Sequence, residues 1–183
     1  VIDAEIDVIR QMGAEFRGGV EVGKDVTLDE LRRQGYKAFF VAIGLQGGRT
    51  AGVPGENAAG VETGIDFLRR MNVDDTQKLT GRTVVIGGGN VAVDVARTAL
   101  RAGSEAVTML CLEGENEMPA ARDEVAEAKH EGITVQNGWG PKEILTDNGK
   151  VTGVVFKKCV RVLDENHRFA PQYDENDTIT VPC

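Results

Sequence analysis

Residues 84–103, with the sequence VVIGGGNVAVDVARTALRAG, place three consecutive glycines between an apolar run and a segment whose apolar residues recur at helical spacing. The apolar run predicts a buried strand, and Gly103 is typical of the residue that follows the end of a helix. The stretch therefore predicts a strand, a tight turn and a helix in direct succession.

The turn fits the pattern G-x-G-x-x-G/A, which between a strand and a helix is typical of the Rossmann dinucleotide-binding unit. Gly87 is expected to make the tight turn, Gly89 to let the backbone approach a pyrophosphate, and Ala92 to let the helix pack closely on the sheet. The first amide groups of the helix would face the phosphates. The candidate cofactor-binding residues of the turn are Gly87, Gly88, Gly89, Asn90, Val91 and Ala92. A glycine-rich turn without a ligand is the alternative that the pattern leaves open.

The segments after the turn alternate between strand and helix patterns, which predicts an α/β fold with a parallel sheet. Strands are predicted at 83–87, 106–112 and 133–136, and helices at 90–103 and 119–132. Asn148-Gly149 between alternating segments is a strong signal for a two-residue hairpin turn, and 178–181 is a further short strand candidate. We therefore expect an antiparallel β-meander after the parallel strands.

The segments before the turn show the same alternation. Helices are predicted at 1–13, 27–35 and 61–72, and strands at 14–22 and 37–44, the latter buried. Thr27 and Glu30 form a capping-box pattern at the start of the second helix. The glycine-rich stretch 45–60 is a connection at which we expect a domain boundary.

The end of the second predicted strand, CLEGENEMPA at 111–120, bears on the choice of dinucleotide. Rossmann units place an acidic side chain there for the adenosine ribose hydroxyls, or an arginine for a 2′-phosphate. Glu113 is the predicted ribose ligand, with Glu117 as the alternative. This acidic segment favours NAD over NADP. An NADP-binding protein that takes its arginine from Arg122 is a second hypothesis.

Composition excludes several other classes. The formal charge of −8 without a basic cluster disfavours nucleic acid as a partner. No run approaches the roughly 20 apolar residues that span a bilayer, and no leader pattern opens the sequence, so we expect a cytoplasmic chain without a membrane span. Three widely spaced cysteines, Cys111, Cys159 and Cys183, predict free thiols rather than disulfides or a metal site.

No side chain is assigned a catalytic role, because the sequence contains no arrangement typical of acid–base or nucleophilic catalysis. Asp94 and Arg97, three residues apart on the predicted helix, are expected to form a surface ion pair.

Several separated stretches together resemble the FAD-dependent pyridine-nucleotide oxidoreductases typified by the small subunit of glutamate synthase. The same module occurs in dihydropyrimidine dehydrogenase and in the large subunit of electron-bifurcating transhydrogenases. The stretches are GAEFRGGVEVGKDVTLDEL (13–31), FFVAIGLQGGRTAGVPGE (39–56), GIDFLRRMN (64–72), the glycine turn with its helix, and EMPAARDEVAEAKHEGI (117–133). They follow the order of the family and cover nearly the whole chain.

The resemblance implies a domain plan. Residues 1–60 are similar to part of an FAD-binding domain, 61–80 to a connecting helix and linker, and 81–183 to an NAD(P)H-binding Rossmann domain with its β-meander. It further implies that Val22 and Gly44 line the flavin site of the full protein. The first FAD fingerprint of the family has no counterpart in this sequence, and Leu112 and Glu113 stand where NADPH-using members usually carry two arginines.

The function implied by the resemblance is hydride transfer between NAD(P)H and FAD, with electrons passed on to an iron–sulfur centre or a partner subunit. The cofactors carry this chemistry, and the protein binds and orients them. A nucleotide-binding or sensing module without catalysis is the alternative, and association of the chain with a second copy is left open.

Overall fold

The computed structural model describes residues 2–74 and 76–183. The chain divides into two compact units, one ending at Gly44 and one from Leu45 to Cys183. The first unit contains the helices α1 (Ile2–Gln11) and α2 (Leu28–Arg33). The predicted capping box of α2 is confirmed, because the Thr27 hydroxyl accepts from the Glu30 amide at 3.2 Å and the Glu30 carboxylate accepts from the Thr27 amide at 2.7 Å. Val1, part of the first predicted helix, lies outside the described residues.

The two strands predicted in the first unit are wrong. Residues 14–22 contribute a single β-bridge, between Val22 and Val26, and residues 37–44 have no regular secondary structure. The second segment is not buried either, since Phe40 is 94% exposed. An apolar run becomes a strand only where a neighbouring strand bonds its backbone, and the described residues of this unit form no sheet.

The second unit is built on a three-stranded parallel sheet in the order β1-β2-β3. Its strands are β1 (Arg82–Ile86), β2 (Ala106–Cys111) and β3 (Thr134–Asn137). Helix α4 (Asn90–Arg101) joins the first two strands, α5 (Arg122–His130) joins the next two, and α3 (Gly64–Val73) packs on α4. The predicted βαβαβ succession is confirmed.

A second sheet follows, with the antiparallel order β4-β5-β6. Its strands are β4 (Trp139–Asp147), β5 (Lys150–Leu163) and β6 (Phe169–Pro182). The predicted hairpin turn is confirmed: Asn148 and Gly149 have positive φ angles of 48° and 78°, as a type I′ turn requires. β6 is much longer than the predicted 178–181, because it pairs with β5 from Leu163 to Gly153.

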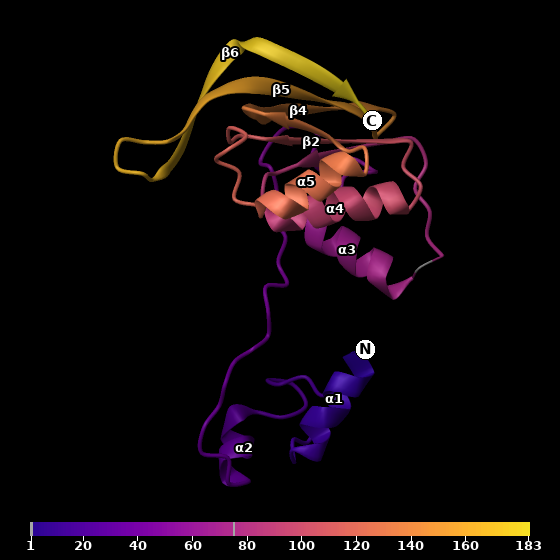
Figure 1. Cartoon of the computed structure of the whole chain (residues 1–183). Helices are drawn as coiled ribbons and strands as arrows, with labels where there is room; N and C mark the ends of the chain where they lie inside the picture. Colours follow the sequence, from indigo (N-terminus) through magenta and orange to yellow (C-terminus); the bar gives the residue numbers. More distant parts are fainter. Residues whose placement is uncertain (1, 75) are drawn as a thin grey trace. The chain divides into compact units, whose positions relative to one another are not determined.

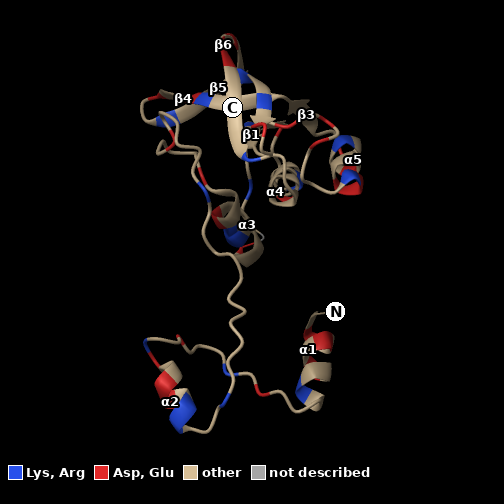
Figure 2. Ribbon diagram, turned by 90° about the vertical axis from the view of Figure 1, so that its left-hand side faces the viewer, with Lys and Arg blue, Asp and Glu red and all other residues tan. Residues whose placement is uncertain are grey.

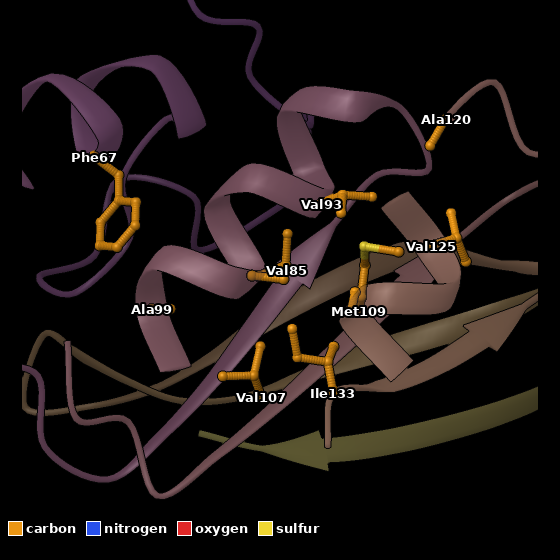
Figure 3. Close-up of a cluster of buried hydrophobic side chains, with 11 residues drawn as sticks. Phe67, Val85, Val93, Ala99, Val107, Met109, Ala120, Val125 and Ile133 are labelled. Carbon is orange, nitrogen blue, oxygen red and sulfur yellow. The ribbon is translucent and has the colours of Figure 1, made fainter. Parts of the chain in front are cut away.

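The parallel sheet is buried on both faces. Helices α3 to α5 cover one face and the meander covers the other (Figure 1). Figure 3 shows Val93 of α4 and Met109 of β2 in the helix-side core, and both side chains are fully buried. Leu110, the next residue of β2, packs on the opposite side with Phe156 of β5. The parallel pairing of β1 with β2 places their carboxyl ends side by side, where the glycine turn begins.

The connection before α3 belongs to the second unit and contacts its antiparallel sheet. The amide of Ile144 donates to the Pro54 carbonyl at 2.9 Å, and the amide of Val151 donates to the Ala59 carbonyl at 3.0 Å. Residues 54–60, within the segment predicted to end the FAD-domain part, therefore lie against the meander. The functional assignment of 1–60, 61–80 and 81–183 stays a prediction.

An ion-pair cluster joins α4 to α5 in place of the predicted Asp94–Arg97 pair. The Arg97 guanidinium lies 2.9 Å from the Glu127 carboxylate and 2.6 Å from that of Glu131, and Arg101 also reaches Glu131, at 2.8 Å. Figure 2 shows basic and acidic residues together on α5. Opposite charges on a neighbouring helix thus replace the pairing expected within α4.

Candidate dinucleotide-binding site

The glycine turn leaves β1 with a conformation that only glycine adopts readily. Gly87 has a φ of 142°, and its amide donates to the Leu110 carbonyl of β2 at 2.8 Å. A Cβ on Gly87 would lie 3.3 Å from the Cβ of Ala92. The turn is therefore tight, and the small Ala92 lies directly behind it at the start of α4.

The next two glycines differ in what surrounds them. A Cβ on Gly88 would lie 2.8 Å from a Glu113 carboxylate oxygen and 2.9 Å from the Cys111 Cβ. A Cβ on Gly89 would have no heavy atom of the described residues within 4 Å. Gly88 is therefore enclosed by the end of β2, whereas the backbone of Gly89 faces open space.

Gly89 is also the N-cap of α4, and no side chain caps the helix there. The first amides of a helix have no intrahelical acceptor, and the helix dipole makes this end electropositive. The open space at Gly89 can accommodate a phosphate group, and the uncapped amides can donate hydrogen bonds to it. Val91 is 47% exposed, so it can contribute its backbone amide to such a site while its side chain faces solvent.

Asn90 has a role that sequence reasoning missed. Its side-chain oxygen accepts a hydrogen bond from the Ala121 amide at 2.8 Å, and the Gly88 carbonyl accepts one from the Ala120 amide at 3.1 Å. These bonds hold the segment before α5 against the turn. The signal in the sequence for this bond is a short amide side chain at the first residue of the helix, where it can reach a neighbouring backbone amide.

Glu113 lies where the sequence predicts, directly beside the turn. Its carboxylate approaches Gly88, and its carbonyl accepts from the Gly138 amide and from the Asn137 side chain, both at 3.1 Å. The residue is half-buried. The end of β3 thus fixes the backbone of Glu113, which leaves its side chain along the turn.

The neighbouring carboxylates are engaged elsewhere. Glu117 accepts from the Gly114 amide at 3.2 Å and so closes its own turn. Glu115 lies 2.6 Å from the Lys129 ammonium, and that hydrogen bond lowers the pKa of the Glu115 carboxyl. Of the acidic side chains in this segment, Glu113 is the one held against the glycine turn.

Cys111 forms the floor beneath Gly88. Burial, with the Glu113 charge as the next cause, raises the pKa of its thiol to about 11. A neutral buried thiol is a poor nucleophile, so Cys111 acts here as a packing residue. The prediction of free thiols is confirmed for all three cysteines.

Other predicted residues lie elsewhere in the structure. Val22 and Gly44 belong to the first unit, where Val22 is 59% exposed and Gly44 has a φ of 68° in an irregular segment. Their contact with FAD stays a prediction. Arg122 is the exposed first residue of α5, directly after the residue that donates to Asn90.

Across 2–74 and 76–183, no helix has the length and apolar character needed to cross a membrane. In the same ranges, no group of three or more His, Cys, Asp and Glu side chains is arranged to hold a metal ion.

Comparisons with known proteins identify relatives over the whole chain. The chain is 35% identical over 190 residues to the NADP(+)-dependent formate dehydrogenase subunit beta of Moorella thermoacetica, covering 100% of this chain and 26% of that protein. It is 34% identical over 195 residues to the glutamate synthase [NADPH] small chain of Halomonas elongata, covering 100% and 41%. The NAD-dependent dihydropyrimidine dehydrogenase subunit PreT of Escherichia coli is 35% identical over 153 residues, covering 83% and 36%. The chain thus spans well under half the length of each relative.

A solved structure shares the fold. FprA from Mycobacterium tuberculosis in complex with NADPH superimposes with a TM-score of 0.76 at 20% identity, covering 99% of this chain and 56% of that chain. The family model for pyridine nucleotide-disulphide oxidoreductases matches residues 5–167. The resemblance inferred from the separated sequence stretches is confirmed: the chain belongs to the pyridine nucleotide-disulphide oxidoreductase family.

Proposed function

We propose that this chain is the nicotinamide-dinucleotide-binding part of an FAD-dependent oxidoreductase that transfers hydride between NAD(P)H and FAD. One observation carries the proposal: the glycine turn offers an open backbone at Gly89, with the Glu113 carboxylate held beside it at Gly88. These are the two features that a dinucleotide requires, one for the pyrophosphate and one for the adenosine ribose.

The residues of this chain would bind the dinucleotide and orient it. The backbone amides of Gly89, Asn90 and Val91 would donate hydrogen bonds to the pyrophosphate, and the Glu113 carboxylate would accept hydrogen bonds from the ribose hydroxyls. When bound, the nicotinamide supplies or receives the hydride, so the protein needs no acid, base or nucleophile for that step. Asn90 contributes further by keeping the segment before α5 in place at the turn.

We propose NAD rather than NADP as the dinucleotide. The relatives include proteins named for each nucleotide, so family membership does not decide between them. The proposal is supported by Glu113, because a carboxylate at the ribose would repel a 2′-phosphate and would accept from a free 2′-hydroxyl. Arg122 is the residue that would have to overcome this repulsion in an NADP-binding protein.

The onward path of the electrons lies outside this chain. We propose a cytoplasmic protein in which FAD passes electrons to an iron–sulfur centre or to a partner subunit. This rests on relatives that are themselves named as subunits or chains of larger enzymes, such as the formate dehydrogenase subunit beta. Val22 and Gly44 are the residues of this chain proposed to line the flavin site.

The test is a calorimetric titration of the chain with NADH and with NADPH, repeated on Glu113→Arg. The original chain should bind NADH more tightly than NADPH. Glu113→Arg should reverse this order, with a change in the ratio of the two Kd values of at least about tenfold, equivalent to about 1.4 kcal/mol. Glu165→Arg makes the same change of charge in the turn between β5 and β6 and should leave the order as it is. An unchanged NADH preference in Glu113→Arg would refute the assignment of Glu113.

A further inference from the structure

The two longest strands of the antiparallel sheet continue past their neighbour. Trp139, the first residue of β4, pairs with Lys158 of β5, and the Gly138 carbonyl just before β4 accepts from the Cys159 amide at 2.9 Å. Beyond this point β5 pairs with β6 alone among the described residues. Figure 1 shows the two strands projecting beyond β4. We call residues 160–172 the arm. A pair of strands without a third strand or a partner is marginally stable in water.

The turn at the end of the arm is held by its own hydrogen bonds. The Asp164 amide donates to the Arg168 carbonyl at 2.8 Å, and the Asp164 carboxylate accepts from the amides of Asn166 and Arg168 at 2.8 and 2.9 Å. His167 has a φ of 57°, which a non-glycine residue keeps only where its surroundings fix it. The end of the arm is therefore ordered before any partner binds, which reduces the entropy lost on binding.

Apolar side chains are exposed on this ordered arm. Leu163 of β5 and Phe169 of β6 are cross-strand partners, so their side chains lie next to each other on one face. Leu163 is 42% exposed, Phe169 is 68% exposed, and Val160, at the base of the arm, is 62% exposed. Apolar and aromatic side chains with charged residues around them have the composition of a protein–protein interface.

The charges of the arm favour a second copy of this chain as the partner. The whole chain has a formal charge of −8, so two copies repel each other on average. The arm carries Arg161 and Arg168 against Asp164 and Glu165, so its own formal charge is zero. The side chains of Arg161, Arg168 and Glu165 are exposed and form no ion pair with the described residues. The arm therefore offers both signs of charge to a surface like itself.

We propose that the arm is the contact surface for a second copy of this chain, in a symmetric dimer in which Leu163 and Phe169 of the two copies pack together. In such a contact both copies use the same surface, so that surface must complement itself. With the twofold axis at Leu163, the residue two positions before it faces the residue two positions after it in the other copy. Arg161 of each copy therefore pairs with Glu165 of the other. The inference goes beyond the proposed function, because no residue of the arm belongs to the proposed dinucleotide site.

Light scattering and sedimentation of the full chain, between about 1 µM and about 1 mM, measure the dimer directly. The average molar mass should rise with concentration from that of one chain towards that of two. Phe169→Glu places two like charges at the centre of the contact and should raise the Kd of the dimer at least about tenfold. Thr180→Glu makes the same change of charge at an exposed residue of β6 outside the arm and should dimerise as the original chain does. Thermal unfolding checks that each variant is folded.

An exchange of charges tests the pairing of Arg161 with Glu165. Arg161→Glu and Glu165→Arg each place like charges opposite each other in both pairs, so each variant alone should have a Kd at least about tenfold above that of the original chain. An equal mixture of the two variants has opposite charges at the facing positions. The mixture should therefore form a dimer with a Kd within about threefold of the original value.

Three results would overturn the proposal. The original chain stays a single copy over the whole range of concentration, a folded Phe169→Glu dimerises as the original chain does, or the mixture of the two charge variants stays monomeric. Calorimetric titration with NADH keeps these results apart from the proposed function. Phe169→Glu should bind NADH with the Kd of the original chain, so loss of the dimer leaves the proposed dinucleotide site intact, and a failure of NADH to bind leaves the dimer intact.

Discussion

Replacing Gly89 by alanine should separate the folding of the glycine turn from its function. Gly89 has a φ of −91° and a ψ of 173°, which alanine adopts without strain, and the added methyl group would have no described atom within 4 Å. Alanine restricts the unfolded chain more than glycine does, which stabilises the fold by about 0.4–1 kcal/mol. Alanine is also a poorer N-cap than glycine, which destabilises the fold by a similar amount. The free energy of unfolding should therefore change by less than about 1 kcal/mol.

Dinucleotide binding should respond quite differently to Gly89→Ala. In the proposed complex the pyrophosphate approaches the backbone of Gly89, and a methyl group there occupies the space of the phosphate oxygens. We expect the Kd for NADH to rise by at least about tenfold, or about 1.4 kcal/mol. Urea denaturation measures the first quantity and calorimetric titration the second. A variant that is as stable as the original chain and binds NADH equally well would refute the placement of the pyrophosphate at Gly89.

Three further predictions concern the surroundings of the turn. Gly88→Ala should lower the free energy of unfolding by about 1–3 kcal/mol in urea denaturation, because its Cβ would meet the Glu113 carboxylate at 2.8 Å and the Cys111 Cβ at 2.9 Å. Hydrogen bonding from Arg97 lowers the pKa of the Glu131 carboxyl below its ordinary 4.5. The ion pair therefore stabilises the fold fully above pH 4.5, and this stabilisation is lost as the pH falls through the lowered pKa. Below pH 4.5 the original chain should therefore lose stability more steeply than Glu131→Gln, and equal slopes would contradict this. With a thiol pKa of about 11, Cys111 should resist iodoacetamide at pH 8 in the folded chain and react in urea, which peptide mass spectrometry can check.

The parts of the fold that local sequence determines were predictable. The glycine turn, the hairpin at Asn148-Gly149 and the capping box at Thr27 all depend on residues within a few positions of one another. In each case the required backbone angle or hydrogen bond is a property of the short segment itself. The position of Glu113 was also predictable, because the end of β2 in a Rossmann unit is fixed by the register with β1.

Features that depend on distant segments were missed. The apolar run at 37–44 has the composition of a strand but meets no neighbouring strand in the described part of its unit. Arg97 pairs with α5 rather than with Asp94, because only the folded chain brings the α5 carboxylates within reach. The bond from Ala121 to Asn90 likewise joins residues that the sequence separates widely. Side-chain character alone could not have indicated these partners.

Amide chemical-shift mapping by NMR, on the isotopically labelled chain during titration with NADH, tests the proposed dinucleotide site most directly. The largest saturable shifts should fall on the backbone amides of Gly89, Asn90 and Val91 and on that of Glu113. If shifts saturate elsewhere while these amides stay unchanged, or if NADH produces no shifts, the glycine turn is not the dinucleotide site and the proposed function loses its basis.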